Sequence, residues 1–270
     1  MVGTLSDAVM ELYLYGFWKI LILAFWVLPL NNPTELLRLC IGVSMLGYGS
    51  YSDVKTREVS DVVWLIMGVS GVFFACIGLF TDSLSYFQLF ESLIVGAIFA
   101  FLLYILNFGG ADIKAIISIS LLFPSYPFFS LFHLRLPLMG VPPVDIFVLS
   151  MLTNALLIAI SAPFALLLYN SFRRNFSPFM FIGWKVMISD LRRKKNYKLV
   201  HEIEEVSGKE KYVWGGIEPT EEILSSLEEL EREKKMDEVW ITPELPFILY
   251  LTAGFFIAVF YGDFISTFFF

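Results

Sequence analysis

The sequence predicts an all-α polytopic membrane protein with about seven transmembrane helices, and its composition, charge distribution and apolar stretches each indicate that class. Hydrophobic residues make up 57% of the 270 residues and charged residues only 17%, whereas a soluble domain is typically near half apolar and a quarter charged. Residues 171–245 carry 13 of the 19 Lys and Arg and 15 of the 26 Asp and Glu. This uneven distribution separates a membrane region from one aqueous segment.

Seven stretches meet or approach the length of roughly 20 apolar residues that a membrane-spanning helix needs. They are residues 12–30, 36–52, 62–80, 88–107, 113–132, 144–170 and 246–268. Pro124 and Pro127 interrupt the fifth stretch. Because membrane helices tolerate proline, we expect this stretch to continue as a kinked helix.

These stretches divide the chain into four predicted regions. They are an extra N-terminal transmembrane segment (1–35), a transmembrane catalytic core (36–170), a small cytoplasmic soluble domain (171–245) and a C-terminal transmembrane helix (246–270). Within the polar region, apolar residues recur at helical spacing opposite a strongly acidic face, which predicts a helix over about 220–237. The apolar positions are Ile223, Leu224, Leu227 and Leu230.

The orientation follows from the basic residues, which gather in the cytoplasmic loops of membrane proteins. Lys55 and Arg57 lie in the loop 53–61, Lys114 lies just after the fourth span, and Arg173 opens the polar region. If all these regions face the cytoplasm, seven alternating spans place the N-terminus inside and the C-terminus outside. The protein is then a multi-pass protein of the cell membrane.

Some partners and groups are not expected. Acidic and basic residues alternate in the polar region without forming a basic groove, so a nucleic-acid partner is not predicted. Cys40 and Cys76 both lie in apolar stretches, and no set of Cys and His has the spacing of a zinc site. We therefore expect neither a metal nor another cofactor.

Two carboxylates are the candidate reactive groups. Asp53 follows the second span and Asp112 follows the fourth, so both fall at the same membrane face. Two close carboxyl groups cannot both ionise easily, and one proton is then shared between them. The ionised group can deprotonate a water while the protonated group donates to the carbonyl that the water attacks, which is general acid–base hydrolysis. The alternative is that Asp53 only begins a loop and Asp112 only caps the next helix.

The residues around this pair supply the expected supporting groups. Gly109 and Gly110 lack a Cβ and would allow an extended substrate to approach the acids. Lys114, Lys55 and Arg57 would hold one aspartate ionised through their positive charge, or would anchor the cytoplasmic face. Anchoring is the expected role of Arg57. Glu58 and Asp61 are expected to solvate the loop or cap the next helix, with attraction of a positively charged substrate as the alternative.

The segment Asp-Val-Lys-Thr-Arg-Glu-Val from Asp53, followed after two spans by Gly-Gly-Ala-Asp-Ile-Lys from Gly109, resembles the type IV prepilin peptidases, and most closely their archaeal branch, the preflagellin peptidases. These are GxGD-type aspartyl proteases, related in chemistry to presenilin. The resemblance runs from about residue 36 to the end. Asp53 and Asp112 match the two catalytic aspartates and Gly109 the first motif glycine, whereas Ala111 replaces the second.

The resemblance implies a substrate and a place of action. The expected partners are membrane-embedded precursors of archaellin or type IV pilin-like proteins, whose N-terminal signals would be cleaved at the cytoplasmic boundary of the bilayer. Bacterial members often carry a four-cysteine zinc cluster and methylate their products, and neither is expected here. Three alternatives remain: a presenilin-like intramembrane protease, a proton-coupled transporter that uses the same carboxylates, and a non-catalytic scaffold.

Overall fold

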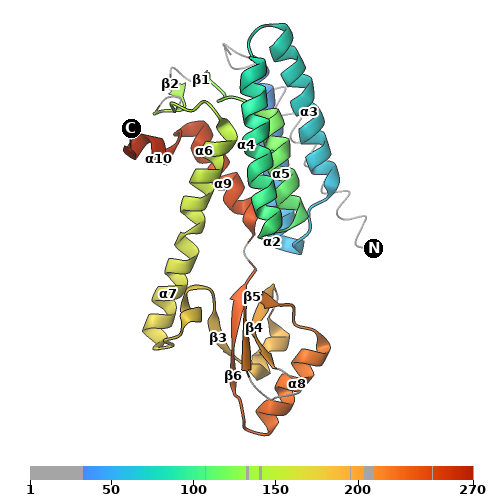
Figure 1. The fold of residues 1–270 in the computed structure, drawn as a ribbon, viewed down its shortest axis with the longest axis vertical. Helices are drawn as coiled ribbons and strands as arrows, with labels where there is room; N and C mark the ends of the chain where they lie inside the picture. Colours follow the sequence, from blue (N-terminus) through green and yellow to red (C-terminus); the bar gives the residue numbers. More distant parts are fainter. Residues whose placement is uncertain are drawn as a thin grey trace. The chain divides into compact units, whose positions relative to one another are not determined.

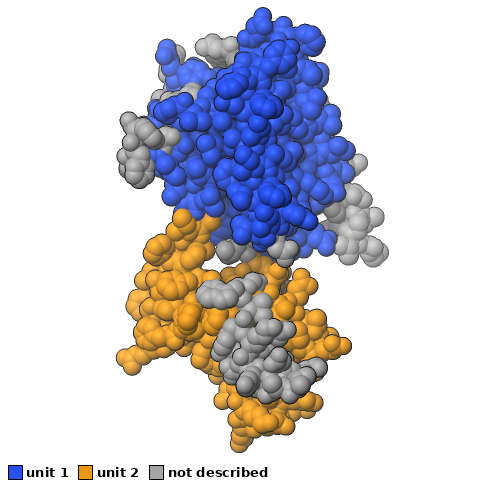
Figure 2. Space-filling model, viewed as in Figure 1, with its two compact units in different colours: residues 1–158, 246–270 blue, residues 159–245 orange. Residues whose placement is uncertain are grey.

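The computed structural model of the chain separates into two compact units. It describes residues 33–106, 108–131, 134–139, 142–194, 196–203, 210–244 and 246–269. One unit comprises residues up to 158 together with 246–270, and the other comprises residues 159–245 (Figure 2). The predicted span at 12–30, and with it most of the predicted extra segment 1–35, lies outside the described residues.

The first unit is a bundle of helices with one short hairpin (Figure 1). Its elements are α2 (Pro33–Thr56), α3 (Asp61–Phe80), α4 (Tyr86–Ile105), α5 (Gly110–Leu122), β1 (Phe129–Leu131), β2 (Leu134–Leu136), α6 (Phe147–Ala159), α9 (Phe247–Phe260) and α10 (Phe264–Phe269). Successive helices from α2 to α5 reverse direction along the bundle. The carboxyl end of α2 and the amino end of α5 therefore lie at the same end.

The short helix α5 is held tightly between its neighbours. It packs against α3 and α4, and it also contacts α2 and α9. A Cβ on Gly71 of α3 would lie only 2.7 Å from the backbone nitrogen of Leu122, so glycine is required for this close approach. The Ser118 hydroxyl donates to the Trp64 carbonyl at 3.0 Å, and the Ser92 hydroxyl donates to the Ser120 carbonyl at 3.0 Å. These contacts fix the helix that carries Asp112.

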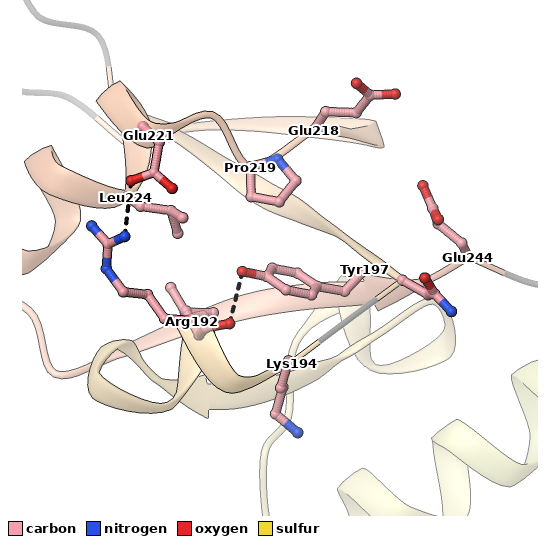
Figure 3. Close-up of a pocket in the computed structure, with 10 residues that line it drawn as sticks. Arg192, Lys194, Tyr197, Glu218, Pro219, Glu221, Leu224 and Glu244 are labelled. Atoms are coloured by element: carbon pink, nitrogen blue, oxygen red, sulfur yellow. Dashed lines mark hydrogen bonds and ion pairs between the residues drawn. The ribbon is translucent and has the colours of Figure 1, made fainter. Parts of the chain in front are cut away.

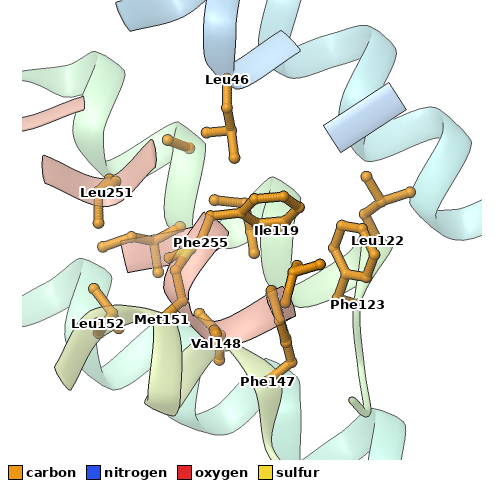
Figure 4. Close-up of a cluster of buried hydrophobic side chains, with 14 of the residues drawn as sticks. Leu46, Ile119, Leu122, Phe123, Phe147, Val148, Met151, Leu152, Leu251 and Phe255 are labelled. Atoms are coloured by element: carbon orange, nitrogen blue, oxygen red, sulfur yellow. The ribbon is translucent and has the colours of Figure 1, made fainter. Parts of the chain in front are cut away.

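A group of aromatic rings forms the centre of the bundle core (Figure 4). Phe123, Phe147 and Phe255 are fully buried and come from three separate segments of the chain. Their ring centroids are 5.0–5.4 Å apart in tilted or edge-to-face arrangements, the geometries that aromatic rings prefer. Leu46 of α2 and Ile119 of α5 pack in the same cluster. The core thus joins α2, α5 and α9, the three helices that surround the candidate site.

Three of the described helical segments are long and apolar enough to cross a membrane: Asp61–Phe80, Tyr86–Ile105 and Phe147–Arg173. They correspond to the third, fourth and sixth predicted spans, and they identify a membrane protein. The third segment consists of α6 followed by α7 (Ser161–Arg173). The second and seventh predicted spans correspond to α2 and α9, which do not meet the same measure of length and hydropathy.

The predicted fifth span is wrong in its extent. The helix ends at Leu122 instead of continuing to residue 132, and β1 pairs with β2 shortly after it. Proline has no backbone N–H and disfavours helical geometry in the residue before it. Pro124 follows the helix end by two residues, so here it marks a termination and not a kink. The last predicted span is also divided, because α9 and α10 are separated at Tyr261–Asp263.

The second unit contains a β-sheet, so the prediction of an all-α chain is wrong for this region. Strands β3 (Trp184–Met187), β4 (Tyr197–Ile203), β5 (Glu210–Ile217) and β6 (Glu238–Pro243) form an antiparallel sheet in the order β3-β6-β4-β5. Two 3-10 helices, η1 (Pro178–Phe181) and η2 (Ile188–Arg193), complete the unit with α7 and α8 (Glu221–Arg232).

The alternation of side chains along β6 explains why the sheet is covered on both faces. Val239 and Ile241 pack with Leu224 and Leu227 of α8, whereas Trp240 packs with a separate cluster at η1. Successive residues of a strand point to opposite faces. The helix predicted over 220–237 is present, but it ends at Arg232.

Candidate active site

Asp53 lies in the last turn of α2 and Asp112 in the first turn of α5. Both aspartates therefore lie at the end of the bundle where α2 finishes and α5 and α9 begin (Figure 1). Both also lie outside the apolar stretches 36–52 and 113–132. The expectation that Asp53, after the second span, and Asp112, after the fourth, lie on the same side agrees with this placement at one end of the bundle.

Asp112 occupies the third helical position of α5, after the N-cap Gly109. The residue is only 9% exposed. Burial, followed by the negative charge of Asp53, raises the pKa of Asp112 to about 7, and the Gly109 backbone N–H opposes this rise. By accepting a hydrogen bond from the Gly109 N–H, the Asp112 carboxylate caps the start of α5. Asp112 therefore has a capping role and also interacts electrostatically with Asp53.

Asp53 has a different environment. Burial raises the pKa of this carboxyl group, while the positive charge of Arg57 and the backbone N–H of Ile248 both lower it. Ile248 is in the first turn of α9, where the helix presents its positive end. The Asp53 Oδ2 atom is buried and has no hydrogen-bond partner among the described residues. This oxygen therefore keeps unused hydrogen-bond acceptor capacity inside the protein.

The chain just after Asp53 turns back on the end of α2. Arg57 has a left-handed backbone with φ of 59°, and its N–H donates to the Asp53 carbonyl at 3.1 Å. The Ser52 hydroxyl donates to the Glu58 carbonyl at 2.6 Å, and the Thr56 hydroxyl donates to the same carbonyl at 3.0 Å. These bonds close the turn that follows the end of α2.

The link between α2 and α9 sets the position of Asp53 from the other side. One turn before Asp53, the hydroxyls of Ser50 and Thr252 lie 2.7 Å apart in a buried hydrogen bond. Thr252 belongs to α9, and its hydroxyl also lies 2.8 Å from the Ile248 carbonyl. Sequence reasoning did not include α9 in the site, because nothing in its apolar sequence signals a polar role for its first turn.

The predicted lysines contact other partners. The Lys114 ammonium forms an ion pair of 2.5 Å with Asp61, at the first turn of α3. The Lys55 ammonium donates to the Tyr51 hydroxyl at 3.2 Å and lies over its ring. The sequence therefore indicated basic residues at this end of the bundle, but it did not indicate which groups they contact. It also gave no sign that Asp61 is the partner of Lys114.

The three small residues before Asp112 have different surroundings. A Cβ on Gly109 would lie 3.3 Å from Asp112 Oδ2, and a Cβ on Gly110 would have no neighbour within 4 Å. Ala111 is helical and packs against the core cluster. The departure at Ala111 from the family motif is therefore compatible with the local backbone, because this residue does not adopt a positive φ.

A separate cavity of about 410 Å³ lies entirely in the second unit (Figure 3). It is lined by residues around Tyr197 and Pro219, including the carboxylates of Glu218 and Glu244. Arg192 forms ion pairs with Glu221 and Glu228 at 2.8 and 2.6 Å, so its charge is already balanced. Neither Asp53 nor Asp112 lines this cavity. Among the described residues, no group of three or more His, Cys, Asp and Glu could hold a metal ion.

Comparison with known proteins gives the class to which this arrangement belongs. Residues 40–172 match the model of the type IV leader peptidase family, and residues 177–264 match the model of the archaeal peptidase A24 C-terminus, type II. Together with the apolar helices, these matches define a membrane-embedded peptidase. The chain belongs to the type IV leader peptidase family, in agreement with the resemblance found at Asp53 and Asp112.

Curated relatives extend the similarity over most of the chain. The preflagellin peptidase of Methanococcus voltae is 26% identical over 238 residues, which cover 83% of this chain and 94% of the relative. The preflagellin peptidase of Methanocaldococcus jannaschii is 26% identical, covering 83% and 93%. That of Methanococcus maripaludis is 24% identical, covering 83% and 94%.

Proposed function

We propose that this protein is an aspartyl endopeptidase that removes the N-terminal signal from archaellin or type IV pilin-like precursors at the cytoplasmic boundary of the membrane. Asp53 and Asp112 are the proposed catalytic pair. Gly109, Gly110, Ala111, Lys114 and Lys55 are the proposed supporting residues. The proposal requires neither a metal nor a covalent intermediate.

The observation that carries this proposal is the placement of the two aspartates, with Asp53 in the last turn of α2 and Asp112 in the first turn of α5, at one end of the bundle. They are 59 positions apart in the sequence, and burial together with the negative charge of Asp53 raises the pKa of Asp112. One group then retains a proton while the other is ionised. The ionised carboxylate can remove a proton from water, and the protonated one can donate to the scissile carbonyl.

The substrate class is supported by the relatives. Three of them are named preflagellin peptidases, and each is matched over more than nine-tenths of its length. A precursor of the flagellin type is therefore the first substrate to test. The cytoplasmic location is supported by the basic residues Lys55, Arg57 and Lys114, which lie at the same end of the bundle as the two aspartates.

The experiment is co-expression with an archaellin precursor, with loss of the N-terminal signal followed by gel mobility and mass. Asp53→Asn and Asp112→Asn keep the size and polarity of each side chain but cannot exchange the proton. We expect each to abolish processing. Asp82→Asn is the matched control, because Asp82 is exposed in the loop between α3 and α4 and its left-handed backbone suits asparagine. Processing at the wild-type rate by either site variant would contradict the proposal.

A further inference from the structure

We propose that the contact between Phe108 and Phe247 positions Asp112 relative to Asp53, so that both carboxyl groups reach the same water and the same peptide carbonyl. This inference rests on the proposed peptidase function, and it adds two positioning residues to the catalytic pair. Phe108 directly precedes Gly109, the N-cap residue of α5, and Phe247 is the first residue of α9.

The rings of Phe108 and Phe247 form a direct contact. Their centroids lie 5.0 Å apart and their planes are inclined by 65°, which is an edge-to-face arrangement. Aromatic pairs prefer this geometry, so the contact restrains the orientation of the two rings as well as their distance. Phe247 packs against the core of the bundle, whereas Phe108 is 40% exposed. The core therefore holds the ring of Phe247, and the contact extends this restraint to the turn that precedes α5.

The first turn of α9 is also fastened to α2, the helix that carries Asp53. The Ser50 hydroxyl lies 3.3 Å from the Ile248 carbonyl oxygen and 2.7 Å from the Thr252 hydroxyl, and both hydrogen bonds are buried. Ser50 stands one turn before Asp53, and Ile248 directly follows Phe247. The beginning of α9 therefore holds the end of α2 through Ser50 and the turn before α5 through Phe247.

The turn before α5 has little packing from its own glycines. Gly109 and Gly110 are exposed, and a Cβ on Gly110 would have no neighbour within 4 Å. The ion pair between Lys114 and Asp61 ties α5 to α3 and does not involve α9. The ring of Phe108 supplies the link from this turn to α9, the helix that also contacts α2.

General acid–base hydrolysis makes the relative position of the two carboxyl groups important. One group accepts a proton from water while the other donates to the carbonyl that this water attacks, so both must lie within hydrogen-bond reach of the same reacting atoms. A misplacement of about 1 Å can cost about a hundredfold in rate. Loss of the ring contact leaves both aspartates in the protein but allows the turn before α5 to shift relative to α9. The effect is therefore expected on kcat and not on KM.

Leucine substitutions remove the rings and keep an apolar side chain. Phe108→Leu, Phe247→Leu and the double variant would be compared with Phe108→Tyr, which keeps the ring at an exposed position. Phe260→Leu is the matched control, because Phe260 is 44% exposed and its ring stacks on Phe256 at the other end of α9, with centroids 6.2 Å apart. Purified full-length protein in detergent would be assayed with the archaellin precursor, and thermal unfolding would be measured for each variant.

We expect Phe108→Leu and Phe247→Leu each to lower kcat about tenfold and to change KM less than about twofold. The double variant should lose little more than either single variant, because both substitutions remove the same contact. Phe108→Tyr should keep most of the wild-type kcat, and Phe260→Leu should keep all of it.

Wild-type kcat in Phe108→Leu would overturn the inference, as would a double variant whose loss is the product of the two single losses. A rise in KM alone would show that the rings bind substrate instead of positioning the aspartates. A loss in Phe108→Tyr equal to that in Phe108→Leu would also contradict the role of the ring. Because Phe108 is exposed, its two variants carry the test if Phe247→Leu unfolds. Wild-type processing by Asp53→Asn or Asp112→Asn would instead contradict the proposed function itself.

Discussion

Lys114 and Asp61 form an ion pair of 2.5 Å that joins the second turn of α5 to the first turn of α3. Lys114 stands two residues after Asp112, so this contact lies next to the candidate pair without including it. Sequence reasoning placed Lys114 beside the aspartates and Asp61 in the loop. In the structure, Lys114 instead links α5, the helix that carries Asp112, to α3 through this ion pair.

The exposed position of this ion pair limits its contribution. Both side chains are about half or more exposed, so Asp61→Asn is expected to lower the free energy of unfolding by no more than about 1 kcal/mol. We expect about a two- to fivefold loss of activity, since the amino-terminal part of α5 loses one restraint. Thermal unfolding in detergent and precursor cleavage at low and high salt measure both effects. A loss of activity as large as that of Asp112→Asn would show that Asp61 has a direct catalytic role.

The raised pKa of Asp112 predicts how activity depends on pH. The pKa of this carboxyl group is about 7, above its usual 3.8, so Asp112 keeps its proton below about pH 7 and loses it above. As the general acid it must be protonated. Initial rates of precursor cleavage should therefore fall as the pH rises through about 7. A rate that stays constant or increases up to pH 9 would contradict this assignment.

Gly109 and Gly110 provide a matched pair of substitutions. Gly109→Ala introduces a methyl group about 3.3 Å from Asp112 Oδ2, a contact that displaces the carboxylate. We expect about a tenfold loss of kcat, in the range typical of a small misplacement at a site. Gly110→Ala enters open space at the first helical position, and it should retain activity with equal or greater stability. Equal effects of the two substitutions would show that crowding at Asp112 is not the cause.

Ala111 provides a test of the departure from the family motif. Its methyl group packs on the core from a helical position, so Ala111→Gly should not increase activity. The substitution is expected to lower the stability by about 0.5–1 kcal/mol, the usual difference between glycine and alanine within a helix. Cleavage kinetics and thermal unfolding would be measured together. A clear gain in turnover would mean that the methyl group restricts the catalytic geometry.

Much of the membrane unit follows from apolar length alone, and the predictions for α3 and α4 were accurate because these helices are long and nearly without charge. The predicted extent of the fifth span was wrong because membrane helices often tolerate proline, and a kinked helix was therefore expected. In the structure Pro124 instead follows the end of the helix. The sheet of the second unit was missed because only the helical periodicity of residues near Leu224 and Leu227 was sought. The run of β-branched and aromatic residues Val239-Trp240-Ile241 was the available signal for a strand.

The candidate pair was accessible from sequence because Asp53 and Asp112 each follow a predicted span, and an even number of spans separates them, so both were expected on one side. The contacts that distinguish the two aspartates were not. The left-handed backbone of Arg57 depends on hydrogen bonds across the loop, and the approach of Ile248 depends on the packing of α2 against α9. Neither leaves a periodic or compositional pattern that a single sequence displays.

The most direct measurement is infrared titration of the protonated carboxyl band of Asp112, identified by its loss in Asp112→Asn. In the wild-type protein this band should disappear near pH 7. In Asp53→Asn it should disappear at a lower pH, because the negative charge that helps to hold the proton on Asp112 is gone. Titration at the same pH in both proteins, or no protonated carboxyl band at pH 5–6, would contradict the coupling of the two aspartates.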